Sequence, residues 1–70
     1  MEITIYKWEP GVQTISLMRW LVRETGVTMH EAKQSVDAFL LGQDIVAFTT
    51  SKLDPKTMST ELAEIGVHWK

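Results

Sequence analysis

The sequence contains no cysteine. This absence excludes a disulfide-stabilised scaffold, a zinc site built on thiolates and a catalytic thiol nucleophile. Aromatic residues make up only 9% of the 70 residues, but three of them are tryptophans. Because a chain of this size builds a small core, we expect its stability to depend on these few large side chains.

Positive charge is also scarce. The chain carries 7 Lys and Arg against 9 Asp and Glu, which gives a net charge of -2. Nucleic acids are bound through several clustered cations. We therefore expect no nucleic-acid partner.

Long apolar runs are missing as well, so we expect no segment that spans a membrane. The first four residues, Met-Glu-Ile-Thr, lack the basic stretch and following apolar stretch of a signal peptide. Together these absences favour a cytoplasmic protein.

Catalytic and metal-binding patterns are absent from the sequence. The two histidines, His30 and His68, have no ligand-like spacing, and no serine lies in a nucleophile motif. Glu61 and Glu64 lie three residues apart, which is the spacing of a solvated helix face. We expect no enzymatic activity, no cofactor and no metal.

Hydrophobic periodicity divides the chain into six elements. Alternating or β-branched stretches predict strands over 2–8, 45–50 and 67–70, and a 3.6-residue period predicts helices over 14–25, 29–41 and 55–65. This order predicts an α+β fold of two layers, with three helices on one face of a small sheet. Residues 1–70 are expected to form a single domain.

Local signals mark several element ends. Thr28-Met29-His30-Glu31 has the form of a capping box at the start of the second helix. Asp54-Pro55 predicts an N-cap followed by proline in the first turn. Gly26 stands where a left-handed C-cap is expected.

The periodicity also predicts inner and outer faces. Ile3 and Ile5 should share one face of the first strand, with Thr4, Tyr6 and Trp8 on the other. The core-facing stripe of the first helix is predicted to be Ile15, Met18, Leu21 and Val22, with Leu17 at its border. In the second helix, the predicted core residues are Met29, Ala32, Val36, Phe39 and Leu40.

Several short stretches match the sequence pattern of a known family. They are the Thr25-Gly26 turn of the helical hairpin, Glu31-Ala32-Lys33, Val36-Asp37 and the end Ile65-Gly66-Val67. Together they resemble the C-terminal domain of the bacterial ribosomal stalk protein of the large subunit. The resemblance implies the fold above and a surface on the first two helices that contacts translation GTPases.

The stretch 42–49, Gly-Gln-Asp-Ile-Val-Ala-Phe-Thr, resembles the second-strand region of the Clp-protease adaptor that recognises destabilising N-termini. That adaptor shares the superfamily fold. Its acidic segment after the first strand is replaced here by residues 7–12, which lack an acidic cluster. An adaptor-like role is therefore an alternative.

The resemblance also suggests a partner-binding face. In the ungapped alignment this face comprises Thr14, Ile15, Met18, Arg19, Val22 and His30. That register buries Glu24, and an unpaired buried carboxylate is costly. We therefore favour a shift of one residue, which turns Trp20 outward as an interface anchor. The alternative is that Trp20 packs against the helices. The predicted partner-binding residues are Ser16, Arg19, Trp20, Arg23 and His30.

A second surface is predicted on the uncovered face of the sheet. Tyr6, Trp8 and Ile45 would make it unusually apolar, which favours weak homodimerisation. The alternative is that the loop around Gly11 or the last strand covers this face.

These observations favour a non-enzymatic, cytoplasmic protein-interaction module. By resemblance its partner would be a translation factor or a protease component. The alternatives are a Clp-adaptor-like protein and a small ligand-binding protein.

Overall fold

The computed structural model describes residues 2–49 and 54–70. The elements follow the predicted order and confirm the α+β fold class. They are β1 Glu2–Trp8, α1 Thr14–Thr25, α2 Met29–Leu40, β2 Ile45–Phe48, α3 Pro55–Ile65 and β3 Val67–Trp69. The strand predicted over 45–50 ends at Phe48, and Thr50 lies outside the described residues.

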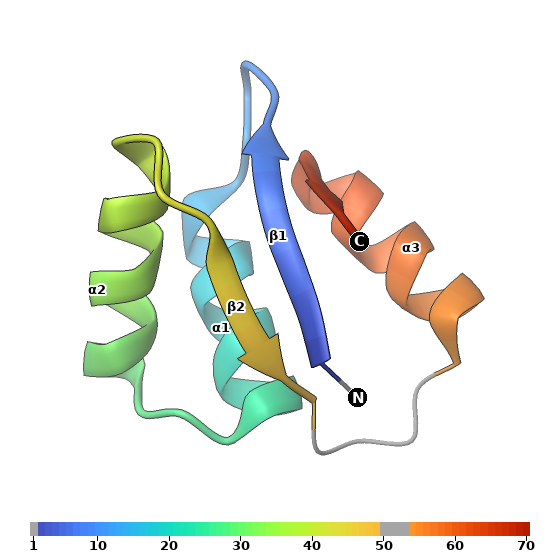
Figure 1. The fold of residues 1–70 in the computed structure, drawn as a ribbon, viewed down its shortest axis with the longest axis horizontal. Coiled ribbons are helices and arrows are strands. Elements are labelled where there is room, and N and C mark those ends of the chain that lie inside the picture. Colours follow the sequence, from blue (N-terminus) through green and yellow to red (C-terminus); the bar gives the residue numbers. More distant parts are fainter. Residues whose placement is uncertain (1, 50–53) are drawn as a thin grey trace.

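The three strands form an antiparallel sheet in the order β2-β1-β3, so the first strand lies in the middle (Figure 1). Ile3 lies opposite Ala47, and Ile5 lies opposite Ile45. Opposite residues of an antiparallel pair project to the same face, and all four side chains are buried. The alternation of Ile3 and Ile5 therefore identifies the covered face of the sheet.

The three helices pack against this apolar face. Each helix contributes to one hydrophobic core, in which the helical members are Leu17, Trp20, Leu21, Ala32, Val36, Phe39, Met58, Leu62 and Ile65. Burying a large apolar side chain contributes about 1.5–3 kcal/mol. The other face of the sheet, which we call the outer face, leaves Tyr6, Val46 and Phe48 exposed.

The predicted helix ends are confirmed. The Thr28 hydroxyl accepts a hydrogen bond from the Glu31 backbone N–H at 3.1 Å, and a Glu31 carboxylate oxygen accepts one from the Thr28 N–H at 3.2 Å. Asp54 accepts from the Thr57 N–H at 2.8 Å. Gly26 caps α1 with φ 75°, the left-handed conformation that glycine adopts at no steric cost.

A bulge interrupts the pairing of β1 with β3. Ile5 lies opposite Trp69, but Lys7 lies opposite His68, so β1 contains one extra residue. The extra residue reverses the alternation beyond Tyr6. Trp8 consequently lies opposite the buried Val67, on the helix side of the sheet rather than on the side predicted for it.

Two predicted core positions in the helices are wrong. Ile15 is 60% exposed and Met29 is 50% exposed, whereas Leu17 and Trp20 are buried. The helix α1 is rotated relative to the predicted orientation, so that Met18 and Val22 flank the core rather than lie at its centre.

The segment after β1 is held against the end of α3. The N–H of Gln13 donates to the Ile65 carbonyl and the N–H of Glu9 donates to the Gly66 carbonyl, both at 2.9 Å. Gly66 has φ 102°, and a Cβ there would stand 3.2 Å from the Val12 Cα. This close approach brings the start of α1 beside the end of α3.

Candidate functional site

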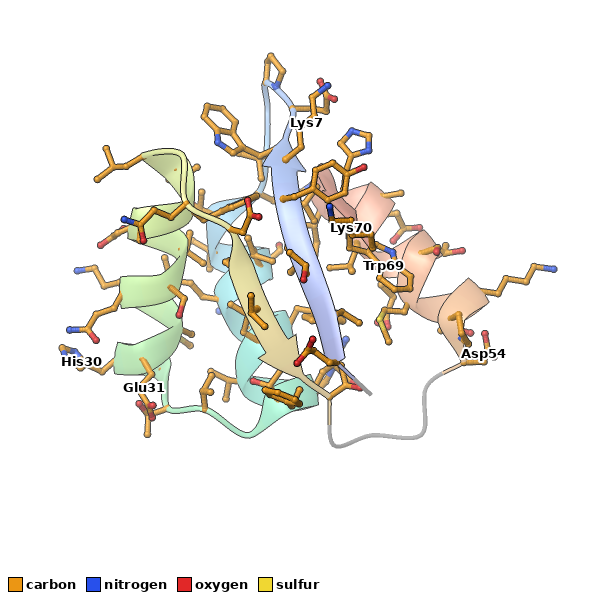
Figure 2. All side chains as sticks on the ribbon, viewed as in Figure 1. Lys7, His30, Glu31, Asp54, Trp69 and Lys70 are labelled. Carbon is orange, nitrogen blue, oxygen red and sulfur yellow. The ribbon has the colours of Figure 1, made fainter. Side chains whose placement is uncertain are left out.

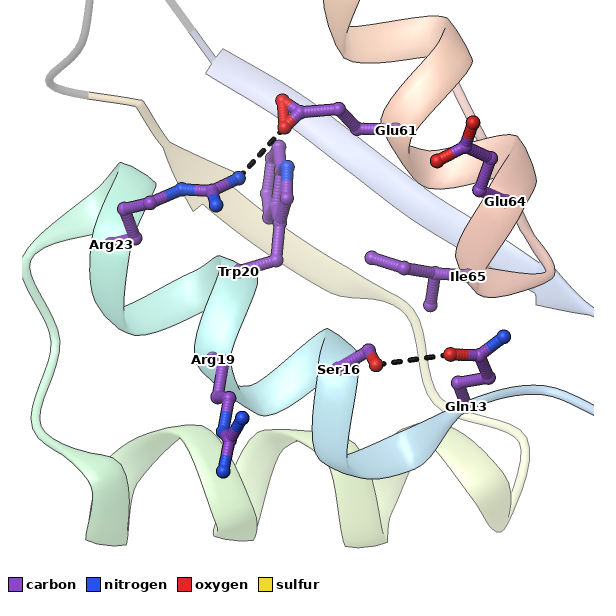
Figure 3. A pocket seen from close by; sticks show the side chains of 8 residues that line it. All are labelled: Gln13, Ser16, Arg19, Trp20, Arg23, Glu61, Glu64 and Ile65. Carbon is purple, nitrogen blue, oxygen red and sulfur yellow. Dashed lines mark hydrogen bonds and ion pairs between the residues drawn. The ribbon is translucent and has the colours of Figure 1, made fainter.

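An open cleft of about 370 Å³ lies between α1 and α3 (Figure 3). Its lining comes from two parts of the chain that are distant in sequence. The lining residues are Gln13, Ser16, Arg19, Trp20, Arg23, Glu61, Glu64 and Ile65. The structure thus brings together four of the five predicted partner-binding residues, namely Ser16, Arg19, Trp20 and Arg23.

Trp20 forms the floor of this cleft rather than a protruding anchor. Its side chain is 2% exposed and belongs to the hydrophobic core. The prediction that Trp20 faces solvent is therefore wrong, and α1 adopts the register that buries Glu24. The reason lies in the pairing of that carboxylate, because Arg23 Nε donates to Glu24 Oε1 at 2.8 Å. The cost expected for an unpaired buried charge does not arise.

The indole nitrogen of Trp20 has no hydrogen-bond partner among the residues that the structure describes. Figure 3 shows this nitrogen on the edge of the ring that faces the space between α1 and α3. Leaving a buried donor unpaired costs about 1–3 kcal/mol, and such groups are rare in native proteins. The N–H is thus a hydrogen-bond donor that the described part of the chain does not use.

Arg23 connects the two walls of the cleft. Its Nη2 atom lies 2.7 Å from Glu61 Oε2, while its Nε atom binds Glu24 on its own helix. The hydrogen bond to Glu24 is the main cause that raises the pKa of Arg23 above its ordinary value, and the charge of Glu61 adds to it. Both sides of this guanidinium are therefore occupied.

Glu64 stands on the same wall as Glu61. Within residues 2–49 and 54–70, its carboxylate makes no ion pair. Arg19 does not serve it, because Figure 3 shows the Arg19 guanidinium pointing away from α3. On the wall formed by α3, Glu64 is therefore a carboxylate that no cation of the described residues pairs with.

Ser16 and Gln13 close the end of the cleft near Ile65. The Ser16 hydroxyl donates to Gln13 Oε1 at 3.1 Å. This contact turns the amide oxygen inward and leaves the amide nitrogen of Gln13 pointing out of the pair (Figure 3). No base lies within the pair, so Ser16 is not activated as a nucleophile.

Sequence reasoning missed the contribution of α3. Glu61 and Glu64 have the spacing that places residues on one side of a helix, and that spacing predicted only a solvated face. What the sequence does not contain is the neighbour, since it gives no indication that this side of α3 lies opposite α1.

His30 is separated from the other predicted site residues. It is exposed on the first turn of α2, on the outer side of that helix (Figure 2). None of the residues that line the cleft belongs to α2. The surface brought together by the structure therefore involves the first and third helices, not the first two.

The three residues predicted for self-association do not share one surface. Tyr6 is exposed on the outer face, where Lys70 Nζ lies 5.3 Å from its ring centre. Ile45 is buried at 6% exposure beneath the sheet, so its assignment to the outer face is wrong. Trp8 is partly exposed but lies on the helix side because of the bulge.

Val46 and Phe48 occupy the place predicted for Ile45. They are 59% and 64% exposed, and they lie opposite Thr4 and Glu2 on the outer face. At the far end of this face, Glu9 Oε1 lies 2.8 Å from His68 Nε2. The hydrogen bond with His68, and then the charge of Lys7, hold the pKa of Glu9 below its ordinary value. Homodimerisation stays a prediction, now with different residues.

No group of three or more His, Asp or Glu side chains within residues 2–49 and 54–70 could hold a metal ion. In the same residues, none of the helices combines the length and the hydropathy that crossing a bilayer requires.

Comparisons with protein-family models, with curated proteins and with solved structures gave no match. The resemblance to the ribosomal stalk domain stays a prediction.

Proposed function

We propose that this protein is a non-enzymatic protein-interaction module that binds its partner in the cleft between α1 and α3. The observation that supports the proposal is the N–H of Trp20 at the floor of the cleft, for which the described part of the chain supplies no acceptor. A buried donor without an acceptor is destabilising, and a bound partner that supplies the acceptor removes this cost. The surrounding charged and polar side chains would form the rim of the interface.

The groups that line the cleft favour binding over catalysis. Ser16 donates to an amide oxygen rather than to a base, and Arg23 is held by two carboxylates. A nucleophile paired with a base, or two carboxyl groups facing one position, would be needed for hydrolysis. A translation factor or a protease component remains the partner that the sequence resemblance suggests.

A small ligand-binding protein is the second candidate. The cleft volume of about 370 Å³ falls within the range of small-molecule sites, about 300–1,000 Å³. If this candidate is right, screening a metabolite mixture by ligand-observed NMR should identify a compound that binds the protein. The Trp20→Phe change should weaken the binding of that compound.

Site-specific photo-crosslinking tests the main proposal. A benzoylphenylalanine residue in place of Ser16, which lines the cleft, should capture one defined protein from the cells that make this chain. The same residue in place of Ser35, which is exposed on α2, is the matched control and should not capture it. Equal products from both positions, or none from position 16, would contradict the proposal.

The role of the indole N–H needs its own variant. Trp20→Phe keeps an aromatic ring on the floor of the cleft and removes only the donor and part of the ring. We expect the crosslinking yield at position 16 to fall about fivefold or more, since one lost hydrogen bond corresponds to about that factor in affinity. An unchanged yield would show that the N–H is not used.

A further inference from the structure

We infer that the occupant of the cleft is a basic peptide segment, whose backbone carbonyl accepts from Trp20 Nε1 and whose lysine or arginine side chain pairs with Glu64. This inference rests on the proposed function and specifies the chemistry of the partner. It also departs from the resemblance, which implies a partner-binding surface on the first two helices.

The first step concerns the donor. The N–H of Trp20 is a donor only, so whatever satisfies it must present an acceptor. The nitrogen itself has almost no accessible surface, so the acceptor must reach in between the side chains of the two walls. A main-chain carbonyl of an extended segment is slender enough to do so, whereas a bulky acidic head group is not.

The second step concerns charge. Glu61 and Glu64 line the wall formed by α3, and Arg23 already binds Glu61 and Glu24. The Arg19 guanidinium points away from α3 (Figure 3). Glu64 therefore contributes a carboxylate that no cation of the described chain neutralises. A carboxylate or phosphate acceptor would be repelled here, and a neutral carbonyl would not.

The third step joins these two groups. Trp20 lies on α1 and Glu64 lies on α3, and both line the same cleft. A neutral acceptor beside a cation is the pattern offered by a peptide that contains lysine or arginine. Arginine would add a planar fork that can bind the carboxylate through two hydrogen bonds. One short segment can thus satisfy both groups at once.

The test uses the indole signals of the intact, nitrogen-15-labelled protein. The chain has three tryptophans, and the Trp20 signal is assigned by its loss in Trp20→Phe. The probes are acetyl-Gly-Lys-Gly-amide and two matched peptides, in which norleucine or glutamate replaces the lysine. Titrations run at constant ionic strength up to about 10 mM, because short peptides of this kind bind in the millimolar range.

We expect the lysine peptide to move the Trp20 N–H signal downfield to saturation. The norleucine peptide should bind about fivefold more weakly, and the glutamate peptide should not move the signal. Glu64→Gln should weaken binding of the lysine peptide by about three- to tenfold. Asp37→Asn, which removes an exposed carboxylate on α2, is the control and should leave it unchanged.

Three outcomes would overturn the inference: no movement of the Trp20 signal, equal binding of the lysine and glutamate peptides, or equal effects of the Glu64 and Asp37 changes. These failures are distinct from a failure of the proposed function. A crosslink from position 16 to an acidic or uncharged segment would retain the interaction module and discard the basic peptide. Absence of any crosslink would discard the module itself.

Discussion

The cleft between α1 and α3 and the outer face of the sheet differ in the kind of group that they leave without a partner. Among residues 2–49 and 54–70, the cleft contains a buried N–H without an acceptor and a carboxylate without a cation. The outer face instead exposes the apolar side chains of Val46 and Phe48, and the polar groups at its far end, Glu9 and His68, pair with one another.

This difference matters because the two conditions carry different costs. Single exposed apolar side chains are common on protein surfaces and need no partner. A buried polar group without a hydrogen bond is penalised by about 1–3 kcal/mol in the unbound state. The cleft is therefore the region whose chemistry demands a particular complement, while the outer face would accept any apolar surface.

The largest expected effect is on the floor of the cleft. Trp20 is buried in the core, so Trp20→Ala should lower the free energy of unfolding by about 3–5 kcal/mol. An exposed anchor, as the sequence had suggested, would leave stability nearly unchanged. Urea denaturation followed by circular dichroism measures the difference. A loss below about 1 kcal/mol would place Trp20 outside the core.

Trp8→Ala is the matched control for this measurement. Trp8 is the same residue type at the end of β1, where 39% of its surface is exposed. Its removal should cost clearly less than that of Trp20, because less surface returns to water.

A medium effect is expected outside both regions. Thr28→Ala removes the acceptor for the Glu31 N–H and should lower the free energy of unfolding by about 0.5–2 kcal/mol. Thr28→Ser keeps a hydroxyl acceptor and should retain most of that stability. The indole signal of Trp20 should keep its position, because α2 does not line the cleft. A moved signal would mean that the cleft depends on the second helix after all.

On the outer face, the expected effect is on association rather than on stability. Phe48→Ser should change the free energy of unfolding by no more than about 0.5 kcal/mol, because the side chain is 64% exposed. It should also weaken the predicted self-association, which sedimentation velocity over rising concentrations would detect. A wild-type protein that stays monomeric throughout would refute self-association through this face.

The smallest effect is expected at Glu9, whose side chain is about half exposed (48%). Its pKa is lowered in the folded state, chiefly by the hydrogen bond with His68. Such a group adds stability that is present above its unfolded pKa and is lost as the pH falls through the folded one. Glu9→Gln should therefore flatten the fall in melting temperature below about pH 4.3, the ordinary value for glutamate. If the melting temperatures of wild type and Glu9→Gln fall identically at low pH, the contact of Glu9 with His68 does not contribute to stability.

The sequence was sufficient for the six elements and for the starts of α2 and α3. Short-range signals decided them, such as the capping box at Thr28 and the proline after Asp54. Alternation in β1 also identified Ile3 and Ile5 as core residues. These signals act within a few residues and need no knowledge of the rest of the fold.

The orientation of α1 could not be obtained in this way. The helix TISLMRWLVRET contains six apolar residues spread around its circumference, which is more than one stripe can bury. The choice between two rotations depended on whether Glu24 would be paired. Arg23, its immediate neighbour, supplies that pairing while also reaching Glu61 on α3.

The faces of β2 were undetermined for a related reason. Ile45, Val46, Ala47 and Phe48 are all apolar, so polarity does not alternate along the strand. Only the register with β1, in which Ile5 faces Ile45, decides which two are buried. The bulge after Ile5 likewise has no sequence signal, and it changed the side on which Trp8 lies.

The central position of β1 bears on the order of folding. Both neighbours of this first strand come from later parts of the chain, and Thr4 exchanges two hydrogen bonds with Lys70. The hairpin of α1 and α2 can form through contacts near in sequence, whereas the sheet must close long loops. During synthesis, the first strand must therefore wait, unpaired on its β3 side, until Val67–Trp69 have left the ribosome. The helix α3, which forms one wall of the cleft, is made directly before the strand that completes the sheet.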